Sequence, residues 1–176
     1  MTSRIVLATT STFGSEGPYA TRVGFDTIGQ AMSGAMFLSG DGKVPTRMNA
    51  PFVDFGTALL NTVGVLAALM ERARSGKGQK VETALLRTAI NITNGHLIEQ
   101  AMLDINRIAT LNRGFTAGPS DTFKCQDGWI YAMTIGQPLF VRWCKLMGDE
   151  SLAQDPRFKD DLARGDNGEA LSAIMQ

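Results

Sequence analysis

The stretch that decides the fold runs from residue 13 to residue 79 and contains three glycine-punctuated blocks. They are FGSEGPY (13–19), GFDTIGQAMSG (24–34), and a segment that begins with DFG (54–56) and ends with RSGKGQ (74–79). Inside the third block, apolar residues recur at helical spacing, namely at Leu59, Val63, Leu66 and Met70. The pattern predicts a helix over residues 51–74 that is buried on nearly all sides, because apolar and small residues also occupy its other faces.

The segments on either side of this helix have recognisable patterns of their own. A β-branched, apolar run predicts a buried strand over residues 4–9. A helix is expected to begin at Asp26 and to end before the Gly-Asp-Gly of residues 40–42, and two prolines predict an extended loop over residues 43–51. A brief extended link follows the RSGKGQ motif, and a second long helix is expected to run to about residue 105.

The remainder of the chain has the pattern of a small α+β unit. Residues 122–125 and 129–135 flank Gln-Asp-Gly, which predicts a β-hairpin because Asp-Gly suits a tight primed turn. A helix over residues 138–147 and a short amphipathic piece over residues 171–175 are expected after it. The aromatic residues of this unit are predicted to form its core: Trp129, Tyr131 and Trp143. We therefore predict an α/β part over residues 1–105, a linker over 106–119, and an α+β part over 120–176.

Composition narrows the class of protein. The 176 residues are 44% hydrophobic and 19% charged with a formal net charge of zero, so no electrostatic argument favours nucleic acid or an anionic membrane as a partner. Cys125 and Cys144 fit no metal-binding spacing and favour free thiols in a reducing compartment. Polar residues precede the apolar run of residues 63–70, so we predict no membrane span. We expect a cytoplasmic protein that binds no metal.

Three acids lie in polar, glycine-rich surroundings and are candidates for chemistry: Asp26, Asp41 and Asp54. Aspartates in such positions are more often turn formers or helix caps than catalysts. The only histidine, His96, is expected in mid-helix beside apolar residues, where a packing role is favoured. The residues alone leave the choice among the three acids open.

The three blocks together resemble the centre of the class III coenzyme A transferases, which include formyl-CoA and carnitine-CoA transferases and the related acyl-CoA racemases. The resemblance implies part of a Rossmann-like large domain with long linker helices, followed by part of a small α+β domain. Members of that family are more than twice as long, so we expect a fragment or a shortened member. The portion that holds CoA in the family would then be absent, and a second copy or a partner supplying the N-terminal half is expected.

The resemblance also implies a reaction. Class III transferases use an aspartate carboxylate to attack an acyl-CoA thioester, which gives a mixed anhydride and a free CoA thiolate, and the acceptor carboxylic acid then takes the CoA. No covalently bound cofactor is implied, and the CoA thioester is a substrate. Asp41, in the loop after the GFDTIGQAMSG block, is placed first as the nucleophile. Asp54 is its rival, because it matches the acid of the racemases' Val-Gly-Asp-Phe motif; its alternative role is to cap the helix that follows.

Two other functions stay open at this level. Racemases of the family pair an acid with a histidine in a Gly-His-Asp segment, and here that segment reads Gly24-Phe25-Asp26. A racemase is therefore the less favoured enzyme. A non-catalytic regulatory or assembly subunit that keeps the fold without the CoA site is the other alternative, so catalysis by this chain alone is left open. The residues do not specify the acyl group or the acceptor acid.

Overall fold

The computed structural model describes residues 4–175, which form two compact units. The first unit ends at Ala109 and the second begins at Thr110. Both units contain helices and strands, so each is a mixed α/β structure. They are described separately below.

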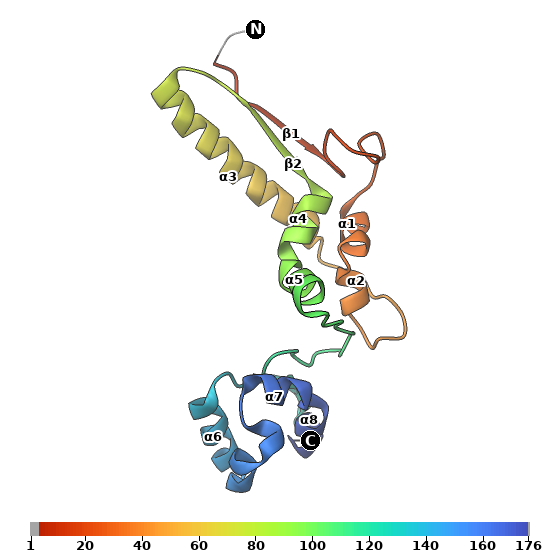
Figure 1. Cartoon of the computed structure of the whole chain (residues 1–176), viewed down its shortest axis with the longest axis vertical. Helices are drawn as coiled ribbons and strands as arrows, with labels where there is room; N and C mark the ends of the chain where they lie inside the picture. Colours follow the sequence, from red (N-terminus) through yellow and green to blue (C-terminus); the bar gives the residue numbers. More distant parts are fainter. Residues whose placement is uncertain (1–3, 176) are drawn as a thin grey trace. The chain divides into compact units, whose positions relative to one another are not determined.

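The first unit is organised around two parallel strands, β1 (Leu7–Ser11) and β2 (Lys80–Ala84). They pair in register from Leu7 opposite Lys80 to Ser11 opposite Ala84. Parallel strands need a long crossover, and α3 (Phe52–Ser75) lies in the segment between them and packs on both (Figure 1). The sequence predicted only an extended link near β2. The link is a strand because its backbone pairs with β1, a long-range contact that local periodicity does not contain.

Helix α3 is as long as predicted but not as buried. It ends at Gly76, whose positive φ of 72° lets its N–H reach the carbonyl oxygen of Arg72 at 2.9 Å. The predicted apolar face is exposed, with Leu59 at 69% and Met70 at 75%. The prediction of nearly complete burial is therefore wrong for this chain, in which only three residues of α3 are buried: Val53, Thr57 and Ala68.

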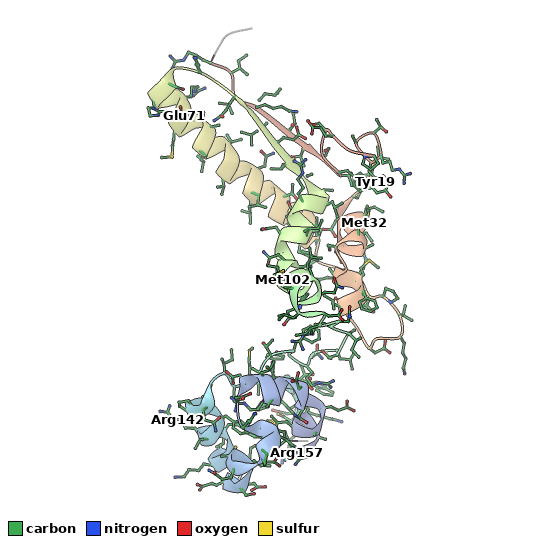
Figure 2. The ribbon with its side chains drawn as sticks, viewed as in Figure 1. Tyr19, Met32, Glu71, Met102, Arg142 and Arg157 are labelled. Atoms are coloured by element: carbon green, nitrogen blue, oxygen red, sulfur yellow. The ribbon has the colours of Figure 1, made fainter. Side chains whose placement is uncertain are left out.

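The same helix is the one segment of residues 4–175 that is long and apolar enough to cross a membrane. Length and composition alone carry little weight here, because the core helices of soluble proteins pass the same test. The exposed apolar surface of α3 is the firmer observation. Helix α5 (Asn94–Leu103) also has no buried residue. Met102 of α5, labelled in Figure 2, is 77% exposed.

Each of the two helices predicted beside α3 is broken into two pieces. The first consists of α1 (Asp26–Met32) and α2 (Ala35–Leu38), separated at Gly34, where φ is 81°. The second consists of α4 (Leu85–Ile92) and α5, separated at Thr93. The Thr93 hydroxyl donates to the carbonyl oxygen of Ser33 at 3.2 Å, so the two breaks lie against each other. Val53, Leu85 and Ala89 form the core beneath them.

The second unit begins with an antiparallel hairpin of β3 (Ser120–Lys124) and β4 (Trp129–Met133), which confirms the hairpin predicted from Asp-Gly. Helix α6 (Gln137–Leu146) is also as predicted. The sequence did not predict the elements between α6 and the last helix: η1 (Glu150–Gln154), η2 (Pro156–Phe158) and α7 (Asp161–Asp166). Helix α8 (Gly168–Met175) contains the predicted amphipathic piece.

Helices rather than the hairpin supply the core of this unit. The buried cluster comprises Phe140, Trp143, Cys144, Leu152, Phe158 and Leu171. Trp143 is therefore core, as predicted, but Trp129 and Tyr131 are 68% and 55% exposed. Placing those two in the core was wrong, because they lie on a face of the two-stranded hairpin that no described element covers.

Glu82 of β2 ties the segment of residues 13–19 to the sheet. Its carboxylate accepts from the backbone N–H of Ser15 at 2.7 Å and from the Ser15 hydroxyl at 2.9 Å. Lys80 and then Ser15 lower the pKa of Glu82 from 4.5 to about 2. Because this pKa is depressed, the link is complete above pH 4.5 and is lost as the pH falls towards 2.

We expect Glu82→Gln to speed hydrogen exchange at the Ser15 amide and in its neighbours, because a neutral amide is a weaker acceptor than a carboxylate. Exchange mass spectrometry at neutral pH measures this. Glu16→Gln, an exposed position in the same segment, is the matched control. Equal protection in both variants would show that Glu82 does not hold the segment.

Candidate functional site

The main cavity of the first unit lies between β1 and the N-terminal half of α3. Its volume is about 660 Å³, within the range of small-molecule sites. It includes the carboxyl end of β1, the edge at which parallel α/β sheets bind ligands. The polar residues on its wall include Thr10 of β1 and Asp54, Thr57 and Asn61 of α3.

Among residues 4–175, Asp54 is the only ionisable residue that lines this cavity. It lies in the first turn of α3, where the helix dipole stabilises a negative charge. Its side chain is exposed, and within residues 4–175 no hydrogen-bond donor is assigned to its carboxylate. The structure thus places an open carboxylate on the wall of a cavity.

Asp26 of α1, and not Asp54, caps α3. One carboxylate oxygen of Asp26 accepts from the backbone N–H groups of Val53 at 2.9 Å and of Asp54 at 3.1 Å. Asp26 is 7% exposed, and the residue at the formal cap position of α3 is Pro51, which makes no side-chain capping bond. The capping role considered for Asp54 is therefore wrong. A residue distant in sequence satisfies the N–H groups that a local cap would satisfy.

Asp41 lies apart from the cavity, in the segment between α2 and α3. Gly40 and Gly42 flank it with positive φ values of 86° and 79°. Its Oδ1 accepts from the backbone N–H of Lys43 at 3.0 Å, which is the geometry of an Asx turn. Asp41 is exposed and is not among the residues that line the cavity beside Asp54. The structure does not bring the two candidate aspartates into one site.

Polar side chains continue along α3 from Asp54. The Asn61 Nδ2 donates to Thr10 Oγ1 at 2.9 Å, and Thr10 in turn bonds to Thr83 at 2.9 Å. The hydroxyl of Thr57 is buried; it donates to the carbonyl oxygen of Val53 at 2.7 Å and lies 2.8 Å from the Thr88 hydroxyl. Our sequence reasoning missed Thr57 and Asn61. Their spacing of three and seven residues from Asp54 was the available signal, because it places all three on one face of a helix.

The single histidine lies elsewhere. His96 of α5 lines a second cavity of about 270 Å³, formed mainly by α2, α5 and residues 105–108. Its Nδ1 lies 3.5 Å from a carboxylate oxygen of Glu99, which Arg107 also contacts with two hydrogen bonds of 3.0 and 2.9 Å. Hydrogen bonds from Arg107 lower the pKa of Glu99. No group of three or more His, Cys, Asp and Glu side chains within residues 4–175 could hold a metal ion.

Comparison with known proteins identifies relatives of the whole chain. The model of the family described as CoA-transferase family III matches residues 1–176. The succinyl-CoA–D-citramalate CoA-transferase of Chloroflexus aurantiacus is 31% identical over 173 residues, and the match covers 97% of this chain and 43% of that protein. The formyl-CoA:oxalate CoA-transferase of Streptomyces coelicolor is 33% identical over 181 residues, covering 92% and 43%.

Solved structures agree with these matches. A CAIB/BAIF family protein from Brucella suis superposes with a TM-score of 0.76 at 29% identity, covering 98% of this chain and 46% of that one. The chain spans less than half the length of these relatives. Because the family model covers every residue, the chain belongs to CoA-transferase family III.

Proposed function

We propose that this chain carries the nucleophile of a class III CoA-transferase, and that the nucleophile is Asp54. The observation that carries the proposal is the position of Asp54, which is the one ionisable residue of the described part of the chain on the wall of the 660 Å³ cavity. Asp41, which the sequence placed first, is engaged in an Asx turn outside that cavity. The geometry therefore supports Asp54 over Asp41.

In the proposed reaction, an oxygen of the Asp54 carboxylate attacks the carbonyl carbon of an acyl-CoA thioester. The carbon–sulfur bond breaks, CoA leaves as the thiolate, and an acyl-aspartyl mixed anhydride remains. The CoA thiolate then attacks the Asp54 carbonyl carbon of the anhydride, which releases the donor acid and leaves an aspartyl-CoA thioester. The acceptor carboxylate displaces the thiolate from this thioester to form a second anhydride, and attack of the thiolate on the acceptor's acyl carbon gives the new CoA thioester and frees the Asp54 carboxylate. The substrates are thus an acyl-CoA and a carboxylic acid, as the names of the matched transferases imply.

A racemase reaction is less well supported by the same geometry. It needs two bases that face one substrate carbon, one to remove the α-proton and one to return it. Within the range that the structure describes, residues 4–175, no second titratable residue lines the cavity of Asp54, and His96 lines the other cavity. Phe25 occupies the position of the racemase histidine in the Gly-His-Asp segment and is 79% exposed.

The function is tested by incubating an active preparation of the protein with an acyl-CoA and carboxylic acids in deuterated water. New CoA thioesters that appear only when an acid is added support transfer. Deuterium at the α-carbon without dependence on an added acid would identify a racemase instead. Neither product, from a folded preparation supplemented with the complementary part of the family fold, would favour a non-catalytic subunit.

We propose in addition that the chain works in an assembly, either with a second copy or with a partner that supplies the rest of the family fold and grips CoA. Apolar residues exposed on α3 and α5 support this, including Leu59 at 69%, Met70 at 75% and Met102 at 77%. We expect residues 1–176 on their own to self-associate at micromolar concentration. Light scattering measures this, and a cooperatively folding monomer would contradict it.

A further inference from the structure

Gln30 of α1 is a buried polar side chain whose amide is fully engaged. It is 1% exposed. Its Nε2 donates to Oδ1 of Asp26 and, at 3.1 Å, to the carbonyl oxygen of Met48, while its Oε1 accepts from the N–H of Met48 at 2.9 Å. Carboxylate and carbonyl oxygens only accept and a backbone N–H only donates, so these partners fix which end of the amide faces which group.

This amide joins three segments around Asp54. Met48 belongs to the loop that leads into α3, Gln30 belongs to α1, and Asp26 holds the N–H groups of Val53 and Asp54 with its other oxygen. Helices α1 and α3 also approach each other closely at Gly29, which has no side chain. A Cβ atom at this position would lie only 2.8 Å from a methyl carbon of Val53. The first turn of α3 is therefore held by two residues of α1, through the hydrogen bonds of Asp26 and the close packing at Gly29.

We propose that Gln30 is a positioning residue for Asp54. This inference rests on the proposed function, in which Asp54 is the nucleophile. The Asp54 side chain has no assigned donor of its own within residues 4–175, so its place in the cavity is set by the backbone of the first turn of α3. Asp26 fixes that turn, and Gln30 fixes both Asp26 and the preceding loop. A shift of about 1 Å in a reacting group costs on the order of 100-fold in rate.

Glutamate cannot replace Gln30. A carboxylate at position 30 has no N–H to offer, so it would face the carboxylate of Asp26 and the carbonyl oxygen of Met48 without a proton between them. The double variant Asp26→Asn, Gln30→Glu reverses the link. The new asparagine amide can donate to the new glutamate while its oxygen still accepts from the first turn of α3. The double variant should therefore recover part of what Gln30→Glu loses.

The experiment has two readouts in the full-length protein that contains this chain. The first is hydrogen exchange at the amides of Val53 and Asp54, which is independent of activity. The second is the kcat and KM of thioester exchange, measured at a temperature where circular dichroism shows each variant to be folded. Gln100→Ala, at an exposed position of α5, is the control. Gln30→Ala removes the amide without adding charge and is used if Gln30→Glu does not fold.

We expect faster exchange at both amides in Gln30→Glu and Gln30→Ala, a fall in kcat of about 100-fold, and a KM within about twofold of wild type. Partial recovery of kcat in the double variant completes the expected result. Unchanged kcat in a variant with lost amide protection would overturn the positioning role and leave Asp54 as the nucleophile. If wild type turns over without forming an acyl adduct on Asp54, the proposed function fails and this inference fails with it.

Discussion

Replacing Asp54 with asparagine is expected to lower the rate of thioester exchange by at least about a thousandfold in an active preparation, because an amide oxygen cannot form the acyl anhydride. The loss should appear in kcat, since the carboxylate acts in the chemical step. Stability should change little, because Asp26 rather than Asp54 holds the N–H groups at the start of α3. Steady-state kinetics and a thermal melt on the same sample measure both effects.

Asp41→Asn is the control for this experiment. It removes a carboxylate from the same part of the chain, but from a turn that lies outside the cavity. We expect its rate to stay within about threefold of wild type, as for an exposed residue that does not touch the reacting atoms. The reverse pattern, with Asp41→Asn inactive and Asp54→Asn active, would transfer the nucleophilic role to Asp41.

Replacing Asp161 with alanine is expected to destabilise the second unit by about 3 kcal/mol. Arg164 is completely buried, lies 4.5 Å from the ring centre of Phe140, and pairs with Asp161. The same carboxylate accepts from the N–H of Gly136 with both oxygens at 3.0 Å. The substitution leaves a buried guanidinium without its counter-ion. The expected loss of stability is at the lower end of the range for broken buried ion pairs, because the Asp161 side chain is 36% exposed.

Glu71→Ala tests whether the burial of Arg164 is the reason for the large loss of stability expected in Asp161→Ala. Glu71, labelled near the end of α3 in Figure 2, pairs with Arg74 at the same spacing of three residues, but the two side chains are 43% and 80% exposed. An exposed pair of this kind contributes about 0.3–0.5 kcal/mol. Urea unfolding of the two variants measures the difference. Equal losses would mean that the Arg164 pair is no stronger than a surface pair.

The pH dependence of the second unit follows from the same carboxylate. Burial alone would raise the pKa of Asp161, but the N–H of Gly136 and the guanidinium of Arg164 outweigh it and lower the pKa below 3.8. A depressed pKa stabilises the folded state above the ordinary value of 3.8 and less so as the pH falls below it. The Asp161→Ala variant should therefore lose stability less steeply than wild type in that acidic range.

Elements set by local pattern were predictable from the sequence, and elements set by long-range pairing were not. The hairpin around Asp-Gly and the length of α3 follow from turn chemistry and from apolar spacing. Strand β2 is a strand because β1 pairs with it, and α4 and α5 separate at Thr93, whose hydroxyl bonds to Ser33. The burial of α3 was overestimated because periodicity shows which face is apolar, but not whether another segment covers it.

The candidate site, too, could be predicted from the sequence only in part. The sequence singled out both Asp41 and Asp54 but could not show that Asp54, and not Asp41, lines the 660 Å³ cavity. The capping of α3 by Asp26, a residue 27 positions before Val53, has no local signature. One partner of the Gln30 amide, Asp26, lies one helical turn before it and has local spacing, but the other, Met48, lies 18 positions away on a loop and has none.

Chemical trapping of the acyl intermediate tests the central claim most directly. An active preparation is mixed with an acyl-CoA and hydroxylamine, which converts an acylated carboxylate into a stable hydroxamate, and the modified residue is then located by peptide mass spectrometry. The proposal predicts a hydroxamate on Asp54 that requires acyl-CoA and is absent from Asp54→Asn. A hydroxamate on Asp41, or none on any residue while thioester exchange proceeds, would contradict it.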